Sequence, residues 1–295
     1  MKKLTLAALG ILALAAVPAS AANWSDTSIA VRRGSEYKEP GIPVSIAKTY
    51  VALNHVSGYA YGGNFFNVDL IQSDSNDPIN SEGPGTSGGA HELYATYKHT
   101  LNLSKVFNTK TGFGPVRDVE FTFGFDYASK NTRFAPAVYK LMAGPQLSFN
   151  VPGFLSVALL YYKEKNHNSF GTFNPKGAMD VTFDPTYQIA AAWGINVPLG
   201  KVNTTVKGFA TYTGAKGRDG SYVETKPETL ANIHWMFDVS PVFGAKKGTF
   251  QIGPGMQYWD NKFGDPTHAT LAETPAGQVV NPRTTAFQFS VEYHF

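Results

Sequence analysis

The stretch FQFSVEYHF, residues 287–295, decides the fold class of this 295-residue chain. Phe287, Phe289, Val291, Tyr293 and Phe295 occupy every second position, and polar residues fill the gaps. A period of two places the two sets on opposite faces of a β-strand, one wholly apolar and the other wholly polar. Chain ends are usually polar and fray, so an aromatic last residue indicates that this strand has a defined place.

The same alternation recurs along the chain and predicts twelve strands. The aromatic residues, 21 Phe and 15 Tyr among them, are spread over the whole sequence. The candidate strands lie at 27–33, 46–56, 63–74, 90–104, 118–129, 138–151, 154–164, 179–196, 202–214, 229–239, 249–260 and 287–295. Nothing after residue 21 approaches 18 consecutive apolar residues, so the pattern predicts no transmembrane helix.

The predicted connections alternate between two kinds. One set is mostly tight, at 57–63, 105–116, 152–153, 198–201 and 240–248. The other is longer and rich in Gly, Pro, Asn and Ser, at 35–45, 75–89, 130–137, 166–178, 216–227 and 261–283. Short turns at one end and long loops at the other are typical of an outer-membrane barrel, with the turns periplasmic and the loops extracellular.

We therefore predict an all-β fold over residues 22–295, a closed antiparallel transmembrane β-barrel of about 12 strands. In lipid every backbone N–H and C=O must be paired internally, and a closed barrel achieves this without an edge. An even strand number places both termini on the periplasmic side. The alternative is a soluble β-sandwich or lipocalin-like barrel, which carries its apolar face inside.

The first residues predict export. Lys2 and Lys3 precede the mainly apolar stretch 4–17, Pro18 follows, and residues 19–21 have the small-x-small form of a cleavage site. This pattern indicates a secretory signal peptide over 1–21. A membrane anchor is the alternative, but the apolar stretch is shorter than the roughly 20 residues that span a bilayer. Together with the barrel pattern, it predicts location in the outer membrane of a Gram-negative bacterium.

The last strand has a second predicted role. Its outward aromatic row ending at Phe295 is the kind of signal that barrel-assembly machinery reads in outer-membrane proteins. Phe295 would then lie at the periplasmic rim, where aromatic girdles contact outer-membrane lipid. We therefore expect the assembly machinery and the lipid as partners of this strand.

Strand parity predicts the residues that face the lumen, with the apolar set facing outward. These inward residues combine eight carboxylates, five basic groups and several aromatic or neutral polar side chains. They are Arg32, Lys48, Asp69, Glu92, Lys98, Glu120, Asp126, Lys140, Glu164, Asp180, Asp184, Lys207, Glu292, His234, Gln146, Tyr94, Tyr162 and Phe65. The parity is expected to slip most readily at Pro145, Pro185 and Pro254, because proline disturbs strand pairing.

A lumen of this composition supports two interpretations. A charge network could simply fill and rigidify the barrel. Alternatively, aromatic rings could stack on a flat solute at roughly 1–3 kcal/mol per base. Carboxylates could accept hydrogen bonds from sugar hydroxyls, and Lys or Arg could meet ring carbonyls or nitrogens. The mixture suits a neutral, polyhydroxylated, aromatic solute better than a simple ion.

The stretch YGGNFFNVDLIQSDSNDP, residues 61–78, resembles the hallmark of the Tsx-like nucleoside-specific channel-forming family. The stretches 24–41, 46–59, 92–105 and 121–131 resemble it as well, and the similarity is most specific in the first half of the chain. The resemblance implies a twelve-stranded outer-membrane porin for nucleosides and deoxynucleosides. It implies phage or colicin binding at the extracellular loops as a further role of some members.

The resemblance also implies candidate site residues, restricted to the matching stretches. They are Phe65, Asn67, Asp69, Glu92, Tyr94, Lys98, Glu120 and Asp126. The alternative function is a surface receptor or a structural barrel whose lumen is plugged. Glycine-rich residues 81–89 and the second half of the chain match the family pattern less closely.

Other kinds of chemistry find little support. The formal net charge is +3, or +1 without Lys2 and Lys3, which gives no electrostatic case for nucleic acid as a partner. The seven His show no metal-ligand spacing, and no local motif indicates an enzyme. The acidic stretch 74–77 lacks the spacing of a Ca²⁺ loop and predicts Asx-turns. We expect no metal and no cofactor.

Overall fold

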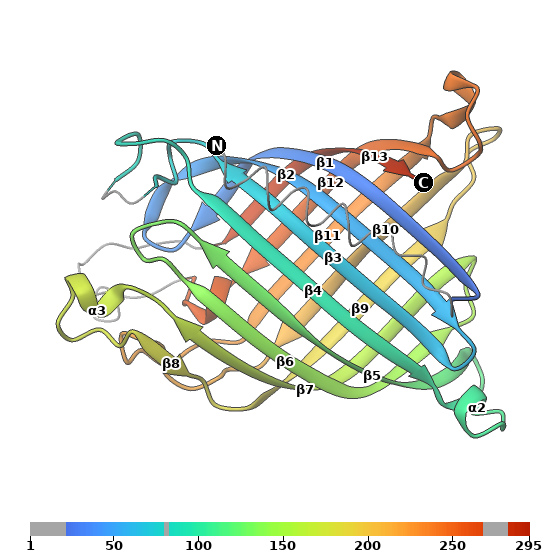
Figure 1. Cartoon of the computed structure of the whole chain (residues 1–295), viewed down its shortest axis with the longest axis horizontal. Coiled ribbons are helices and arrows are strands. Elements are labelled where there is room, and N and C mark those ends of the chain that lie inside the picture. The colour runs from blue at the N-terminus through green and yellow to red at the C-terminus, as the bar shows by residue number, and fades with distance from the viewer. Residues whose placement is uncertain (1–21, 80–82, 268–282) are drawn as a thin grey trace.

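A computed structural model describes residues 22–79, 83–267 and 283–295. Its strands form one antiparallel sheet that closes on itself (Figure 1). The strands are β1 (Trp24–Glu39), β2 (Ile42–Tyr59), β3 (Gly62–Ser73), β4 (His91–Asn102), β5 (Val116–Lys130), β6 (Ala137–Phe149), β7 (Gly153–His167), β8 (Asp180–Thr182), β9 (Thr186–Asn196), β10 (Thr204–Thr213), β11 (Glu228–Asp238), β12 (Phe250–Asp260) and β13 (Thr284–His294). β8 and β9 pair with successive parts of β7 and form one interrupted strand. The fold is therefore the predicted all-β barrel of twelve strands.

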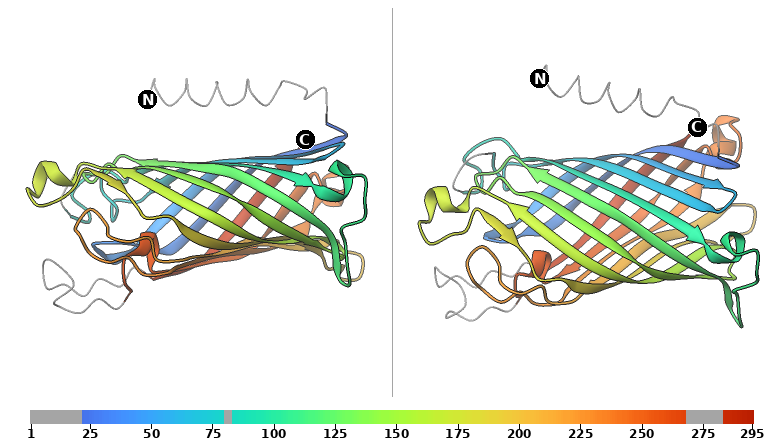
Figure 2. Two further views of the ribbon diagram at one scale, coloured as in Figure 1. Left: turned by 90° about the horizontal axis from the view of Figure 1, so that it is seen from below. Right: turned by 60° about the horizontal axis from the view of Figure 1, so that its bottom comes forward.

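The strands tilt around a common axis and their connections alternate between two ends (Figure 2). One end, called the terminal end, holds the start of β1, the end of β13, α2 (Leu103–Val106) and η1 (Ser240–Phe243). The opposite end, called the loop end, holds α3 (Phe170–Phe173) and η2 (Lys262–Gly264). The structure thus confirms that the first and last strands meet side by side with their outer ends together.

Short helices lie only in the connections of the described chain. No helix within residues 22–79, 83–267 and 283–295 has the length and apolar character needed to cross a bilayer.

The predicted long loop at 35–45 is wrong. β1 continues to Glu39 and β2 begins at Ile42, so a two-residue turn joins them. Gly41 has a φ of +79°, a conformation that favours glycine, and this allows the tight turn. The register between β1 and β2 shifts on both sides of Tyr37. These irregularities allow a stretch rich in loop-forming residues to pair as part of two β-strands. The composition of the stretch alone does not predict this pairing.

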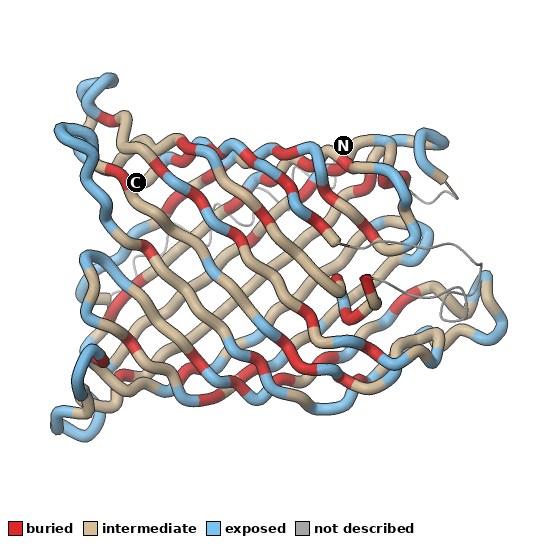
Figure 3. The backbone as a smooth tube through the Cα atoms, turned by 180° about the vertical axis from the view of Figure 1, so that it is seen from behind, coloured by how far each residue is buried: buried red, intermediate tan, exposed pale blue. Residues whose placement is uncertain are grey.

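The outward face of the barrel is largely apolar, and exposed and buried residues alternate along the strands (Figure 3). Its exposed large side chains include Val31, Val51, Phe121, Phe123, Phe125, Tyr139, Leu141, Leu159, Tyr161, Tyr187, Ile189, Phe287, Phe289, Val291 and Tyr293. This arrangement is the reverse of a soluble β-sandwich or lipocalin-like barrel, whose apolar face is turned inward. It is the arrangement that a lipid environment requires.

The last strand closes the barrel as predicted. β13 pairs with β1 from Ser28 opposite His294 onward, and the Phe295 N–H donates to the carbonyl oxygen of Thr27 at 3.0 Å. The Phe295 ring stacks on Tyr293 with 5.9 Å between ring centroids. The use of this strand as an assembly signal stays a prediction. The signal peptide predicted over 1–21 lies outside the described residues.

The interior is not uniformly polar, as simple parity would suggest. On β6, β7 and β9 a small apolar cluster forms from Met142, Ala158, Leu160 and Ala190, all on the inward face. The segment around Leu160 is apolar on both faces, so alternation alone cannot identify its inward side chains. Polar inward residues flank this cluster on the same strands, with Gln146 on β6, Glu164 on β7 and Gln188 on β9.

Candidate functional site in the barrel interior

All eight candidate residues carried by the family resemblance point into the barrel. They lie on the neighbouring strands β3, β4 and β5, and pairing brings several of them side by side. Phe65 is opposite Lys98, Asn67 is opposite Thr96, and Asp69 is opposite Tyr94. The same parity places Glu92, Glu120 and Asp126 inward from β4 and β5.

All four candidate carboxylates already have partners. Asp69 Oδ1 accepts from Arg32 Nη2 at 2.7 Å, and Tyr94 donates its hydroxyl to Asp126 Oδ2 at 2.6 Å. Glu120 Oε2 accepts from Gln146 Nε2 at 2.6 Å. Glu92 lies 3.6 Å from Lys48 Nζ and forms a looser ion pair. These contacts make up the charge network that was one interpretation of the sequence.

Three of the eight candidates, Phe65, Asn67 and Lys98, have side chains that are not part of this charge network. We call these three residues the free row. The side chains of Asn67 and Lys98 make no hydrogen bond or ion pair with any residue that the structure describes. All three are partly exposed inside the barrel. Phe65 and Lys98 are direct neighbours across β3 and β4, and Asn67 is the next inward residue after Phe65. The free row is therefore the part of the predicted site that is available to a solute.

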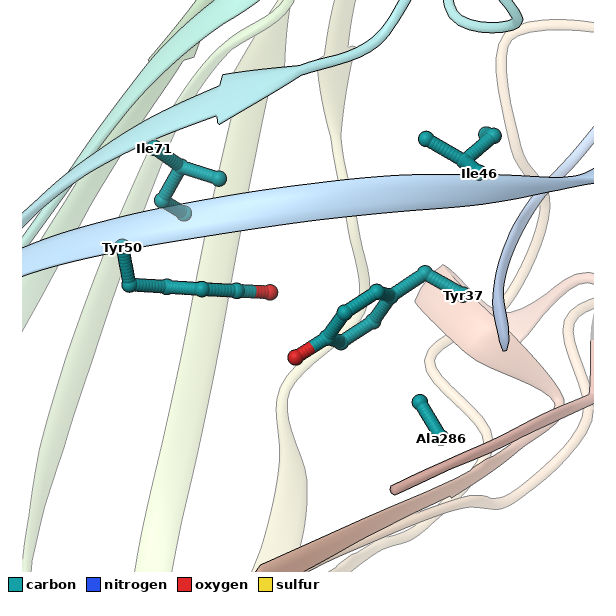
Figure 4. Packing of buried hydrophobic residues seen from close by; sticks show 5 residues of the cluster. All are labelled: Tyr37, Ile46, Tyr50, Ile71 and Ala286. Carbon is teal, nitrogen blue, oxygen red and sulfur yellow. The ribbon is translucent and has the colours of Figure 1, made fainter. Parts of the chain in front are cut away.

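An aromatic cluster lies beside this region, on β1 and β2 (Figure 4). Tyr37 and Tyr50 face each other with ring centroids 5.7 Å apart, and Ile71 and Ala286 pack with them. The Arg32 guanidinium lies over the Tyr50 ring at 5.1 Å. Sequence reasoning missed Tyr37, because its segment read as a loop.

A buried charge cluster, the loop-end cluster, closes around Glu39. Its Oε1 lies 2.5 Å from Lys48 Nζ, 2.9 Å from Lys262 Nζ and 3.5 Å from Lys130 Nζ. Lys130 also pairs with Asp77 at 2.8 Å. Lys262 belongs to η2 and reaches the cluster from the connection between β12 and β13. Of the five residues, the sequence prediction contained only Lys48, because the others lie in segments that read as loops.

A second buried pair lies on the other side of the loop end. Lys216 Nζ contacts Glu164 Oε2 at 2.7 Å, and Tyr162 donates its hydroxyl to the same oxygen at 2.6 Å. The Lys216 ammonium also lies over the Phe183 ring at 4.3 Å. Glu164 and Tyr162 were predicted to face inward, while Lys216 comes from the connection between β10 and β11.

Two groups in the β12–β13 connection titrate near neutrality. Burial lowers the pKa of the Lys262 ammonium to about 8, and nearby Lys48 acts in the same direction while Glu39 opposes it. Burial raises the pKa of the Asp265 carboxyl to about 7, with the negative charge of Asp219 adding to the effect. The charge at the loop end therefore changes between mildly acidic and mildly basic pH.

The prediction that Asp180 and Asp184 face the lumen is wrong. Asp180 is 83% exposed and lies 2.7 Å from His167, and Asp184 is also exposed. The strand is interrupted between β8 and β9, where Pro185 cannot donate to the ladder, and Phe183 takes the inward position instead.

The other two proline positions cause no such slip. The register is the same before and after Pro145 and before and after Pro254. The remaining predicted lumen residues lie on inward faces. The predicted Asx-turn is present, since Asp74 Oδ1 accepts from the Asn76 N–H at 3.0 Å.

Comparison with known proteins gives structural similarity only. No family model matches the chain, and no curated protein matches it. Among solved structures, the translocator domain of autotransporter NalP from Neisseria meningitidis is 12% identical with a TM-score of 0.47, covering 100% of this chain and 96% of that chain. The NanC porin is 8% identical with a TM-score of 0.48, covering 90% and 98%. The KdgM porin in complex with disordered oligogalacturonate is 12% identical with a TM-score of 0.41, covering 91% and 99%.

Proposed function

We propose that the chain is a passive channel for nucleosides and deoxynucleosides in the outer membrane of a Gram-negative bacterium. One observation carries the proposal: the free row places an aromatic ring, an amide and an ammonium side by side inside a closed barrel. A nucleoside offers matching chemistry, with a flat base, edges that carry donors and acceptors, and carbonyl or ring-nitrogen acceptors.

Each member of the free row has a separate role in this proposal. Phe65 stacks on the base, at roughly 1–3 kcal/mol. The Asn67 amide both donates and accepts hydrogen bonds, and Lys98 donates to a carbonyl or ring nitrogen. Asp69 and Asp126 keep spare lone pairs for ribose hydroxyls, although each already accepts one hydrogen bond or more. They also hold their neighbours in place.

Binding along this row has to be weak. A channel must release its solute as readily as it admits it, so a deep well would stop the flux. We expect affinities in the micromolar to millimolar range, about −8 to −4 kcal/mol. One stacked ring and two or three hydrogen bonds that compete with water are consistent with that range.

The membrane location is supported by the outside of the barrel. Its exposed surface carries Phe, Tyr, Leu, Ile and Val on neighbouring strands, and its strands are paired all the way round. Such a surface would be costly in water and is stable in lipid. The barrel then has the loop end outside the cell and the terminal end in the periplasm, in line with its long and short connections.

The test compares two neighbouring phenylalanines in planar bilayers. Phe65→Leu should raise the adenosine concentration that half-blocks the current about fivefold, because a stacking ring is lost. Phe66→Leu is the matched control, since Phe66 faces outward between His55 and Tyr97. Equal half-blocking concentrations for the two variants would reject the role of the free row.

A second candidate function is a surface receptor, or a structural barrel, with a plugged interior. It is favoured by the loop-end cluster, in which Lys262 from a connecting segment is buried against Glu39. In that case the exposed connections at the loop end would bind a phage or a colicin. Single-channel recording separates the two functions, because a plugged barrel passes no steady current while a channel does.

A further inference from the structure

Unpartnered polar atoms inside the barrel gather on one part of the wall. Ten buried side-chain nitrogen or oxygen atoms of the described residues lack a hydrogen-bond partner, and eight of them belong to β1, β11 and β13. One of the eight, His294 Nε2, lies 3.4 Å from Glu292 Oε2, and the other seven lie on neighbouring inward positions. The seven are Arg32 Nε, Tyr37 Oη, Asn232 Oδ1, His234 Nδ1, His234 Nε2, Gln288 Nε2 and Ser290 Oγ. Buried polar groups are normally paired, so such a concentration makes this wall a candidate binding surface.

Strand pairing brings these residues together. His234 is opposite Gly255, Gly255 is opposite Gln288, and Gln288 is opposite Gly34. Ser290 and Arg32 form the next directly paired positions on β13 and β1. Asn232 is one inward residue before His234 on β11. The unpartnered atoms therefore share one continuous surface.

Glycine at two positions lets the His234 and Tyr37 rings pack close to the backbone of this surface. A Cβ at Gly255 would lie 2.3 Å from His234 Nδ1, and a Cβ at Gly34 would lie 3.2 Å from Tyr37 Oη. Larger residues would push both rings toward the barrel axis. The glycines thus recess the wall where the unpartnered atoms are found.

A buried amide on another part of the barrel wall, Gln188, gives a direct comparison. Gln188 on β9 is 8% exposed and donates to Thr213 Oγ1 at 2.9 Å. Gln288 is 6% exposed and its Nε2 has no partner. The two residues have the same side chain and similar burial, so burial alone does not leave an amide unpaired.

We propose that Asn232, His234, Gln288 and Ser290 form a second subsite, which binds the polar edge of a heterocyclic base. The four unpartnered side chains are neutral amides, an imidazole and a hydroxyl, and together they offer donors and acceptors. An anion could not donate to Asn232 Oδ1, and a metal cation could not accept from Gln288 Nε2. An amide side chain pairs well with a base edge, because both present a donor beside an acceptor.

The subsite connects to the free row through one ion pair. Arg32 lies opposite Ser290, and its Nη2 donates to Asp69 on β3 at 2.7 Å. Asp69 is the inward residue that follows Asn67. The Arg32–Asp69 ion pair therefore links this wall to the strand that carries Phe65 and Asn67. The inference rests on the proposed nucleoside channel.

The test measures current block by uridine, uracil and ribose in planar bilayers. Gln288→Leu and Asn232→Leu should each raise the half-blocking concentration of uridine and uracil about tenfold, because a base hydrogen bond is lost. Block by ribose should not change. Gln188→Leu is the matched control and should leave uridine block unchanged. Heat-modifiable gel mobility identifies variants that fold as barrels.

The outcomes separate this inference from the proposed function. If uridine blocks the wild-type channel and Phe65→Leu weakens the block, while Gln288→Leu and Asn232→Leu have no effect, the subsite is refuted and the channel stands. If the two variants weaken block by ribose instead, the wall binds sugar and the base-edge assignment is wrong. If neither uridine nor uracil blocks the wild type, the proposed function and the subsite both fail.

Discussion

Replacing Glu39 by Gln should release the connection that reaches into the loop end of the barrel. The Glu39 side chain is 6% exposed and lies within 3.5 Å of three ammonium groups. Glutamine preserves its shape and removes its charge. Lys48 and Lys130 each keep a second carboxylate, at 3.6 Å and 2.8 Å. Lys262 loses the single ion pair that it makes among the described residues.

The expected magnitude follows from the loss of one partner of a buried ion pair. Such a loss costs about 3–5 kcal/mol, and we expect about 3 kcal/mol because two lysines keep a partner. The free energy of unfolding in lipid vesicles, measured by urea titration with tryptophan fluorescence, should fall by this amount. Single-channel conductance should rise as the Lys262 segment moves away.

The control is Glu36→Gln, because Glu36 is exposed and lies in the same strand. Its effect should stay below about 0.5 kcal/mol. Adding Lys262→Met to Glu39→Gln should restore part of the lost stability, since an unpaired buried charge is removed. If Glu39→Gln changes neither the unfolding free energy nor the conductance, the loop-end cluster does not hold the connection in place.

Two further predictions concern charge and packing. Between pH 6 and pH 9 Asp265 gains a negative charge near its pKa of about 7, and Lys262 loses a positive charge near its pKa of about 8. The preference of the channel for cations over anions should therefore rise about twofold. Reversal potentials in a KCl gradient measure this, and a flat profile would contradict it. Gly34→Ala should lower the unfolding free energy by about 1–3 kcal/mol, because its Cβ would lie 2.5 Å from the Phe287 carbonyl oxygen and 3.0 Å from the Tyr37 ring. A urea titration that matches the wild type would show that the wall adjusts freely.

The barrel could be predicted from the sequence because lipid imposes a strict rule on it. Outward side chains have to be apolar, so the period of two survives along strands such as Phe287 to Phe295. Register with the neighbouring strand then follows from which face is apolar. This rule placed the candidate residues from Phe65 to Asp126 on the correct face.

The parts that could not be predicted have local physical causes. Tyr37 and Glu39 lie in a bulged hairpin whose composition is that of a loop, so their inward positions were missed. Lys262 and Lys216 come from connections, and only tertiary packing brings them to Glu39 and Glu164. Alternation describes strands and contains no information on how connections fold back over the barrel mouth.

Strand parity predicted which candidate residues face inward. It could not predict which of them are already paired with other side chains. Asp69 seemed as available as Asn67, because both are polar and share one face. The difference depends on Arg32, which is distant in sequence and reaches Asp69 from β1 across β2. Such pairings across strands depend on side-chain length and barrel radius, and neither is visible in a single sequence.

The central claim is that nucleosides pass through and bind inside this barrel. Adding adenosine to one side of a planar bilayer that contains the wild-type protein tests it most directly. The proposal predicts steady single-channel current that millimolar adenosine reduces in a saturable way, while ribose at the same concentration has a much weaker effect. Steady current that millimolar adenosine leaves unchanged would contradict the nucleoside assignment, and no current at all would favour the plugged barrel.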